Sequence, residues 1–223
     1  MGKKLINCDL GECQTPNPDI DIMPLINMAN IACGGHIGDD ESMIETIQLA
    51  KKNKIKIGAH PSYLDWANFG RVSHQLNHQD LYDLLYQQIS HLQMLCHENK
   101  VTLEYVKPHG VLYHDMMQKP PIFDVIIDVI QTLDEKMSLV VQAGKKISNK
   151  TNIRLLHEVF ADRAYQGADM IARSQLGAVL DNADAIVEQY QRFSNSNAFK
   201  IDTICFHSDN PASVEALKRL KNA

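Results

Sequence analysis

Short apolar runs rich in β-branched residues alternate along the chain with longer stretches in which apolar residues recur every three or four positions. A short apolar run is typical of a buried strand, and the longer periodicity is typical of a helix that covers a sheet. The short runs lie at about residues 3–8, 29–33, 54–59, 102–107, 138–142, 154–160 and 200–206. The pattern therefore predicts seven strands.

Helical patterns fall between these strands. They cover residues 40–52, 79–97, 122–133, a stretch that begins near Asp181, Asn182 and Asp184 and runs through Tyr190, and 211–221. Pro120 and Pro121 suit the start of the third helix, because the first backbone N–H groups of a helix have no intrahelical acceptor. The succession of strands and helices predicts an α/β fold with a parallel sheet, open or closed. Since 223 residues suffice for one α/β barrel, we expect a single domain over residues 1–223.

Ionisable and amide side chains gather where the predicted strands end. They are Asn7, Asp9 and Glu12 after the first strand, His36 and Asp39 after the second, His60 after the third, Lys107 and His109 after the fourth, Glu158, Asp162 and Arg163 after the sixth, and His207 and Asp209 after the seventh. In a closed (β/α) barrel all strand ends meet on the face that carries the active site. An open sheet would spread them along a crevice. Six such groups favour the closed barrel and one shared pocket.

Composition narrows the class of ligand and the compartment. The formal net charge is −5 and no long basic run is present, which argues against a nucleic-acid binder and favours a small-molecule ligand. No window approaches the ~18 to 20 apolar residues of a membrane span. The five cysteines form an odd set without a C-x-x-C pair, unlike a disulfide framework or a structural zinc site. We expect free thiols and a cytoplasmic protein.

Six segments resemble the signature blocks of a known family. They are INCDLGE (6–12), NIACGGHIGDD (30–40), IGAHPSYLDWANFGR (57–71), VKPHGVLYH (106–114), EVFADRAY (158–165) and ICFHSDNP (204–211). In this order they resemble the LamB/YcsF family over nearly the whole chain. Gly35, His114 and Ser208 depart from the residues usual in that family, which affects the fine shape of the pocket.

The resemblance implies a fold and a reaction. The fold is a distorted seven-stranded β/α (TIM-like) barrel of the glycoside hydrolase and deacetylase type. The reaction is that of an ATP-hydrolysing 5-oxoprolinase, in which 5-oxo-L-proline is cleaved to L-glutamate together with 5-oxoprolinase subunits B and C.

Opening an unactivated lactam needs an activated water, stabilisation of the developing oxyanion and an acid for the departing nitrogen. Asp9, beside Glu12, is a candidate general base whose pKa neighbouring charges would tune. His60 is a candidate acid or water-orienting group, and Lys107 could stabilise a carbonyl oxygen or a phosphate. The catalytic candidates are Asp9, His60, Lys107, His109 and His207. The substrate-binding candidates are Asn7, Glu12, His36, Arg71, Glu158, Asp162, Arg163 and Asp209.

Structural roles compete with these functional ones. Asp9 could cap nearby N–H groups, and each histidine taken singly could be a hydrogen-bonded structural residue. Glu158, Asp162 and Arg163 could form a salt-bridge network that closes the barrel mouth. Arg71 and Arg173 could be surface charges or clamps for a carboxylate.

Cofactor binding is less determined by the sequence. ACGGHIG is not a G-x-G-x-x-G motif and GKKIS lacks the upstream glycine of a P-loop, so ATP with Mg²⁺ would bind through another arrangement or on a partner subunit. Histidines and an aspartate at one barrel mouth could hold Zn²⁺, although no H-x-x-x-H or H-E-x-x-H pair falls on one predicted helix. Whether a catalytic divalent metal is bound stays open at this point.

Three hypotheses remain. The chain is the catalytic subunit of an ATP-dependent lactam hydrolase, a stand-alone metal-dependent amide or carbohydrate hydrolase, or a non-catalytic substrate-binding subunit. The sequence leaves open whether the protein forms a homo-oligomer, and whether the barrel closes completely after its seventh strand.

Overall fold

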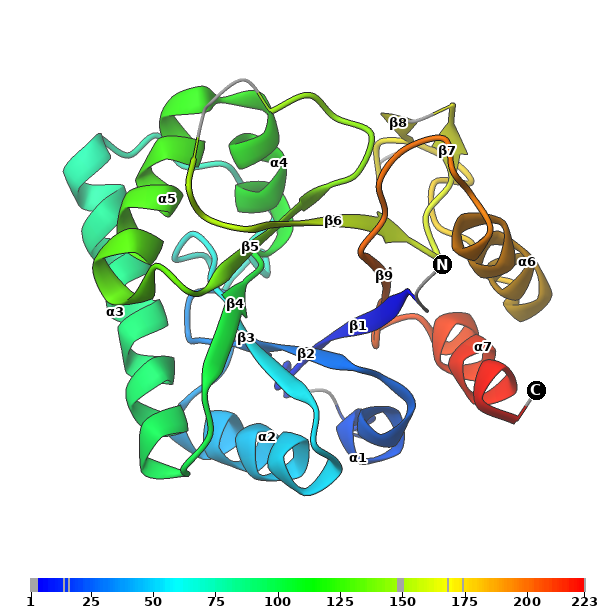
Figure 1. The fold of residues 1–223 in the computed structure, drawn as a ribbon, viewed down its shortest axis with the longest axis horizontal. Helices are drawn as coiled ribbons and strands as arrows, with labels where there is room; N and C mark the ends of the chain where they lie inside the picture. The colour runs from blue at the N-terminus through cyan, green and yellow to red at the C-terminus, as the bar shows by residue number, and fades with distance from the viewer. Residues whose placement is uncertain are drawn as a thin grey trace.

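Seven parallel strands form a closed barrel in the computed structural model, which describes residues 4–13, 15, 17–147, 151–167, 169–173 and 175–222 (Figure 1). The strands are β1 (Leu5–Leu10), β2 (Met28–Ala32), β3 (Lys56–His60), β4 (Leu103–Val106), β5 (Ser138–Gln142), β6 (Leu155–Phe160) and β9 (Thr203–Phe206). Neighbours follow the order β1-β2-β3-β4-β5-β6-β9, and β9 pairs with both β6 and β1. The prediction of a seven-stranded closed barrel is confirmed. Residue 3 of the first predicted strand lies outside the described residues.

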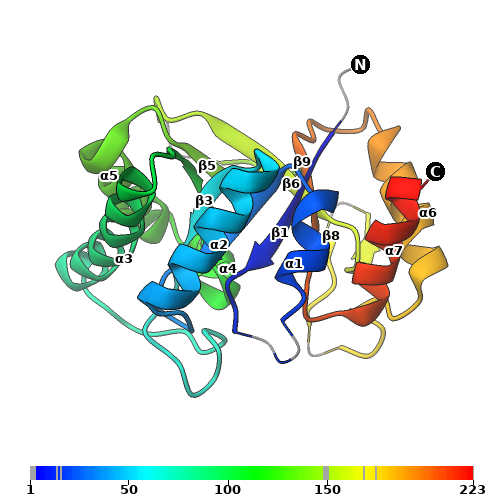
Figure 2. The same cartoon turned by 90° about the horizontal axis from the view of Figure 1, so that it is seen from below.

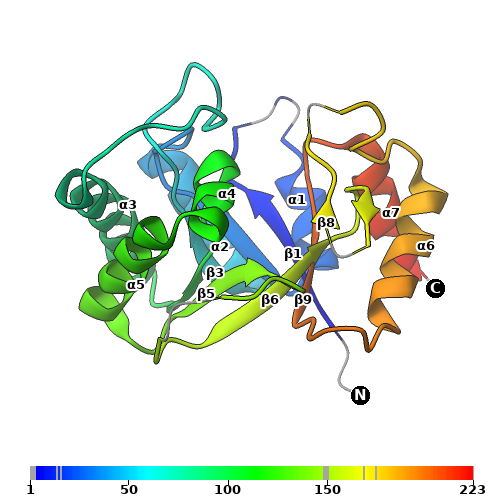
Figure 3. The same cartoon turned by 90° about the horizontal axis from the view of Figure 1, so that it is seen from above.

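Helices surround the strands on the outside of the barrel (Figures 1 and 2). They are α1 (Asp19–Ile22) with the 3-10 turn η1 (Met23–Leu25), α2 (Asp40–Asn53), α3 (His78–Glu98), α4 (Gly110–Gln118), α5 (Pro120–Asp134), α6 (Ala183–Ser194) and α7 (Pro211–Asn222). The pair α3 and α5 packs side by side at one side of the barrel, and the pair α6 and α7 at the other (Figure 3).

Local sequence sets the ends of α2. The Asp39 side chain accepts a hydrogen bond from the backbone N–H of Ser42, and the Ser42 side chain accepts one from the backbone N–H of Asp39. This capping box starts the helix, so Asp39 serves as a helix cap on the surface. At the other end Lys54 adopts the left-handed conformation, with φ 57°. The helix therefore ends there, and β3 begins two residues later than the apolar run predicted.

Two regions differ from the predicted pattern. The helix α4 was not predicted: it follows directly on the polar K-P-H sequence, and its buried residues include the carboxylate of Asp115, which interrupts the apolar periodicity. Between β6 and α6, the described residues form the small antiparallel pair β7 (Tyr165–Gln166) and β8 (Asp169–Met170). This pair stands outside the barrel sheet, which closes directly from β6 to β9.

The barrel interior changes from apolar to charged along its axis. A cluster of Met28, Tyr105, Val140 and Leu156 fills the amino-terminal end. Gly58 leaves room for the Tyr105 ring, since a β-carbon at Gly58 would lie 2.1 Å from it. These residues form the packed floor on which the polar site rests.

All five cysteines are free, with Cys13 exposed and the others buried. Among the described residues, no helix is both long enough and apolar enough to span a bilayer.

Candidate active site

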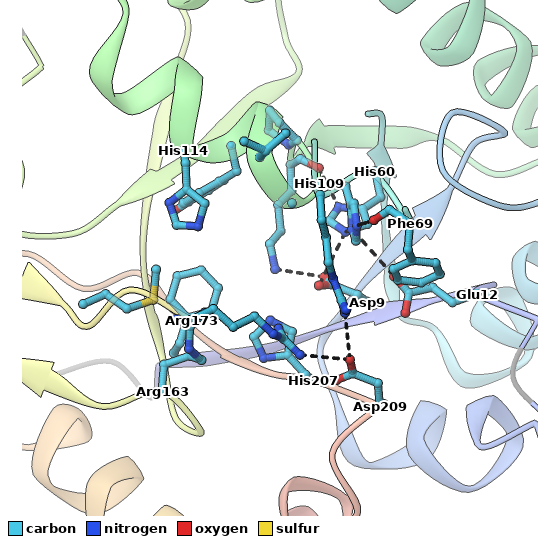
Figure 4. A pocket seen from close by; sticks show the side chains of 18 of the residues that line it. Asp9, Glu12, His60, Phe69, His109, His114, Arg163, Arg173, His207 and Asp209 are labelled. Carbon is cyan, nitrogen blue, oxygen red and sulfur yellow. Dashed lines mark hydrogen bonds and ion pairs between the residues drawn. The ribbon is translucent and has the colours of Figure 1, made fainter. Parts of the chain in front are cut away.

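A cavity of about 450 Å³ opens at the carboxyl ends of the barrel strands (Figure 4). The predicted site residues that line it are Asp9, Glu12, His60, Arg71, Lys107, His109, Arg163, His207 and Asp209. The remaining predicted residues, Asn7, His36, Glu158 and Asp162, are buried and contact residues that line it. The barrel thus brings into one place side chains from both ends of the sequence.

Lys107 lies at the centre of an ionic cluster on the cavity floor. Its Nζ is 2.9 Å from Asp9 Oδ1 and 3.1 Å from Glu158 Oε2, and it donates a hydrogen bond of 3.2 Å to Asn7 Oδ1. Burial would lower the pKa of Lys107, but the charge of Asp9 and its other neighbours outweigh burial and raise it. Lys107 is therefore a charged ammonium held between two carboxylates.

Asp9 is oriented by contacts to both carboxylate oxygens. Its Oδ1 also accepts a hydrogen bond of 2.6 Å from Asn30 Nδ2, and its Oδ2 lies 3.4 Å from His60 Nε2. Burial would raise the pKa of Asp9, but His60 and Lys107 together hold it well below its usual range. A general base near neutral pH is helped by a raised pKa. The pKa of Asp9 is thus shifted in the direction opposite to the one expected from the sequence, because the contacts with His60 and Lys107 outweigh desolvation.

Glu12 and three histidines form a second cluster beside Asp9. The rings of His36 and His109 stack with centroids 3.6 Å apart, and His109 Nδ1 lies 2.9 Å from His60 Nε2. Burial, with the charge of Asp9, raises the pKa of Glu12 to about 7. Burial, with the neighbouring His60, lowers the pKa of His36 to about 3, and the same causes lower the pKa of His109. His36 and His109 are therefore uncharged at neutral pH.

Two glycines allow His109 to take this place. Gly70 and Gly110 have φ of +65° and +52°, a conformation that favours glycine. A β-carbon at Gly110 would lie 2.5 Å from the carbonyl oxygen of Gly70, and one at Gly70 would lie 2.8 Å from His109 Cδ2. The loop before α3 and the start of α4 can therefore approach each other only with glycine at both positions.

His207 lines the same cavity, apart from His60 and His109 (Figure 4), and forms a hydrogen-bonded pair with the buried Asp162. The two carboxylate oxygens of Asp162 lie 2.8 and 3.0 Å from His207 Nδ1, and the ring stacks on Phe160. Burial would lower the pKa of His207, but the charge and hydrogen bond of Asp162 outweigh it and raise it. Since Nδ1 is committed to Asp162, Nε2 is the ring nitrogen left to meet a ligand.

Two arginines lie at the cavity mouth. Arg71 Nη2 is 3.5 Å and Arg173 Nη2 is 3.2 Å from the same Asp209 oxygen. Both guanidinium groups are about half exposed, so one carboxylate is shared by two cations. The mouth therefore retains donors suited to the carboxylate of a ligand.

Arg163 has a different environment from the one predicted. Its Nε donates to the carbonyl oxygen of Ala178 and its Nη2 to that of Ile171. Glu158 pairs with Lys107 instead. Because Asp162 pairs with His207, the three residues Glu158, Asp162 and Arg163 do not form the mutual network considered above. Arg163 instead holds the segment after β6 against the cavity.

The sequence profile of the LamB/YcsF family matches residues 5–223. The chain belongs to the LamB/YcsF family. It is 39% identical to a protein of Vibrio cholerae whose name is that of the A subunit of 5-oxoprolinase, with 100% of this chain and 99% of that protein covered. A relative of the same name from Pseudomonas fluorescens is 37% identical, with 100% and 97% covered. The crystal structure of a lactam utilization protein from Thermus thermophilus superposes with a TM-score of 0.88 at 27% identity, covering 99% of this chain and 96% of that one.

Sequence reasoning missed two polar residues in the site of this LamB/YcsF chain. Asn30 donates to both Asn7 Oδ1 and Asp9 Oδ1, and Cys205 Sγ lies 3.1 Å from Lys107 Nζ. Both are buried within strands. The signal that could have revealed them is a single polar residue inside an apolar strand. The prediction considered only polar residues at strand ends.

Two groups of side chains in the described part of this LamB/YcsF chain have the spacing of metal ligands. One consists of Glu12, His36, His60 and His109, and the other of Asp9, Cys205 and His207. The second is a poor cation site because the Lys107 ammonium already lies against two of its members. Burial also raises the pKa of the Cys205 thiol, which disfavours the thiolate that binds metals.

Proposed function

We propose that this chain is the ring-opening subunit of an ATP-dependent 5-oxoprolinase, which cleaves 5-oxo-L-proline to L-glutamate together with partner subunits B and C. The observation that carries the proposal is one cavity lined by both the Asp9 carboxylate and His207, whose ring is held by Asp162. Full-length relatives that carry the name of this activity support the choice of substrate.

The cavity provides the groups that lactam hydrolysis needs. Lys107 keeps Asp9 ionised and in place. The lowered pKa of Asp9 makes it a weaker base than a raised pKa would, but the ionised carboxylate still orients the attacking water and accepts its proton as the new C–O bond forms. The C–N bond then breaks, and His207 gives its proton to the departing ring nitrogen. Asp162 holds the ring of His207 and favours its charged form. A volume of about 450 Å³ falls in the range of small-molecule sites.

The arginines at the mouth bind the substrate carboxylate in this proposal. Arg71 and Arg173 share one oxygen of Asp209, so each keeps further N–H donors for an incoming anion. A planar guanidinium matches a carboxylate in two parallel hydrogen bonds. This contact fixes the end of 5-oxoproline that does not react.

ATP supplies the driving force that an unstrained five-membered lactam lacks. Transfer of the γ-phosphoryl group of ATP to the lactam oxygen releases ADP and makes the ring carbon a better electrophile. Addition of one water and cleavage of the C–N bond give an acyl phosphate of glutamate, and a second water hydrolyses it to glutamate and phosphate. The chain contains no Walker motif. We therefore assign binding of ATP with Mg²⁺ to a partner subunit, and hydrolysis of the activated lactam to this chain.

A reconstituted assay tests the proposal. The protein is mixed with subunits B and C, ATP, Mg²⁺ and 5-oxo-L-proline, and glutamate and ADP are measured. We expect glutamate only when ATP and all subunits are present. Glutamate formed without ATP or partners would instead identify a stand-alone hydrolase. Binding of 5-oxoproline without glutamate under any condition would identify a non-catalytic binding subunit.

A further inference from the structure

The protons on two histidines of the second cluster are fixed by the backbone. His60 Nδ1 lies 2.7 Å from the carbonyl oxygen of Lys107, and His109 Nε2 lies 3.0 Å from that of Phe69. A carbonyl oxygen only accepts hydrogen bonds, so each of these ring nitrogens must carry the proton. In the neutral rings, His60 Nε2 and His109 Nδ1 therefore carry no proton, and each presents a lone pair as an acceptor.

The third histidine is fixed in the same way through a serine. The Ser62 hydroxyl donates to the carbonyl oxygen of Tyr63 at 2.7 Å, so its own proton is already used. It must then accept from His36 Nδ1, which lies 3.2 Å away. His36 Nε2 is left bare as well.

These bare nitrogens and one carboxylate oxygen face each other in a buried space. His60 Nε2 and His109 Nδ1 are 2.9 Å apart, which is a hydrogen-bond distance, but in the neutral rings both atoms are acceptors and neither has a proton to donate. His36 Nε2 and Glu12 Oε1 are 3.4 Å apart, and neither atom has a hydrogen-bond partner among the described residues. Buried acceptors left unsatisfied in this way are costly and uncommon.

We propose that Glu12, His36, His60 and His109 bind one divalent transition-metal ion, with Zn²⁺ preferred. Their ligand atoms all lie within 4.8 Å of one another. Metal–ligand bonds of about 2.0–2.1 Å in a tetrahedral site put neighbouring ligand atoms about 3.3 Å apart. The separations of 2.9, 3.4 and 3.7 Å scatter around this value.

The outer contacts match those of metal-binding histidines, which donate their second ring N–H to a carbonyl or another fixed acceptor. A single proton could bridge only one of the two facing pairs, whereas one metal ion contacts all four atoms. Imidazole and carboxylate donors suit Zn²⁺ among the divalent ions, and also Co²⁺ as its spectroscopic substitute.

The site would lie at the edge of the catalytic cavity. Glu12, His60 and His109 line that cavity, and Asp9 Oδ2 is 3.4 Å from His60 Nε2. A bound ion would face the cavity beside Asp9 and could lower the pKa of a water or polarise a carbonyl oxygen there. Metal binding by these residues deepens the proposed function but does not rest on it.

Metal content and a cobalt spectrum test the inference. Untagged protein is loaded with Zn²⁺ or Co²⁺, freed of excess metal, and measured by elemental analysis and visible absorption. We expect about one ion per chain and the intense visible bands of low-coordinate Co²⁺. Glu12→Gln and His36→Asn should each weaken binding by about 100-fold or more. His97→Asn, which changes an exposed histidine of α3, should bind as the wild type does.

Two results would overturn the inference. One is wild-type protein that keeps less than about 0.1 ion per chain after loading, and the other is unchanged Co²⁺ affinity and spectrum in both site variants. Far-UV circular dichroism identifies a variant that has lost its fold, and the isosteric Glu12→Gln then decides. Metal binding without glutamate formation would support the metal site and reject the proposed reaction. Glutamate formation by protein that binds no metal after loading would support the reaction and reject the metal site.

Discussion

Replacing Lys107 by methionine removes the only positive charge between two buried carboxylates among the described residues of the cavity floor. Lys107 lies 2.9 Å from Asp9 and 3.1 Å from Glu158, with 2% of its surface exposed. At an effective dielectric constant of about 20, each contact is worth roughly 5 kcal/mol in isolation. Desolvation of the three charges opposes this, so removing one partner of such a cluster costs about 3–5 kcal/mol. We expect Lys107→Met to lower the free energy of unfolding by that amount.

Urea denaturation of the wild type and Lys107→Met at pH 7 measures this loss. The matched control is Lys218→Met, whose exposed pair with Asp21 at 3.2 Å should contribute only about 0.2–1 kcal/mol. The double variant Asp9→Asn/Lys107→Met should be more stable than the sum of the two single losses predicts, because it leaves fewer uncompensated charges. A loss below 1 kcal/mol for Lys107→Met, or strictly additive losses, would refute the reasoning.

Other predictions concern separate parts of the structure. The wild type should have a higher unfolding free energy than His207→Gln, and this difference should be largest near pH 5.5 and smaller at pH 9. The pKa of His207 is raised in the folded state, so its charged pair with Asp162 stabilises the fold at low pH and is lost as His207 deprotonates. A difference that does not change with pH would contradict this. Gly110→Ala should cost at least about 1–2 kcal/mol in thermal or urea unfolding, because of its φ and the clash with Gly70, and wild-type stability would reject that geometry. A thiol reagent should label Cys13 rapidly in the native protein, and rapid labelling of more than one thiol would contradict the burial of the others.

The order of strands and helices could be predicted because each strand has its own apolar run and the helices between them are amphipathic. The helix α4 could not, since its buried face mixes Leu112 and Tyr113 with the charged Asp115. The segment between β6 and α6 carries no regular apolar period, so its short pair β7–β8 left no signal. The structure of both regions therefore depends on tertiary contacts that the local sequence pattern does not reveal.

The gathering of the site could be predicted, because parallel strands in a barrel present their carboxyl ends together. The pairing inside the site could not. Which carboxylate neutralises Lys107, and which one holds His207, depends on the registers of strands far apart in the sequence. The opposite pKa directions of Asp9 and Glu12 follow from those pairings, since Asp9 contacts a cation and Glu12 is buried near another anion.

The most direct test of the account is glutamate formation by Asp9→Asn in the reconstituted complex with subunits B and C, ATP and 5-oxo-L-proline. The variant keeps the size of the side chain and removes the charge that orients and deprotonates water. The account predicts that glutamate formation falls by about 100-fold or more, a loss typical of removing a group that transfers a proton, while the complex still assembles and Asp21→Asn on the surface behaves as the wild type. Wild-type rates in Asp9→Asn would show that the chemistry takes place elsewhere.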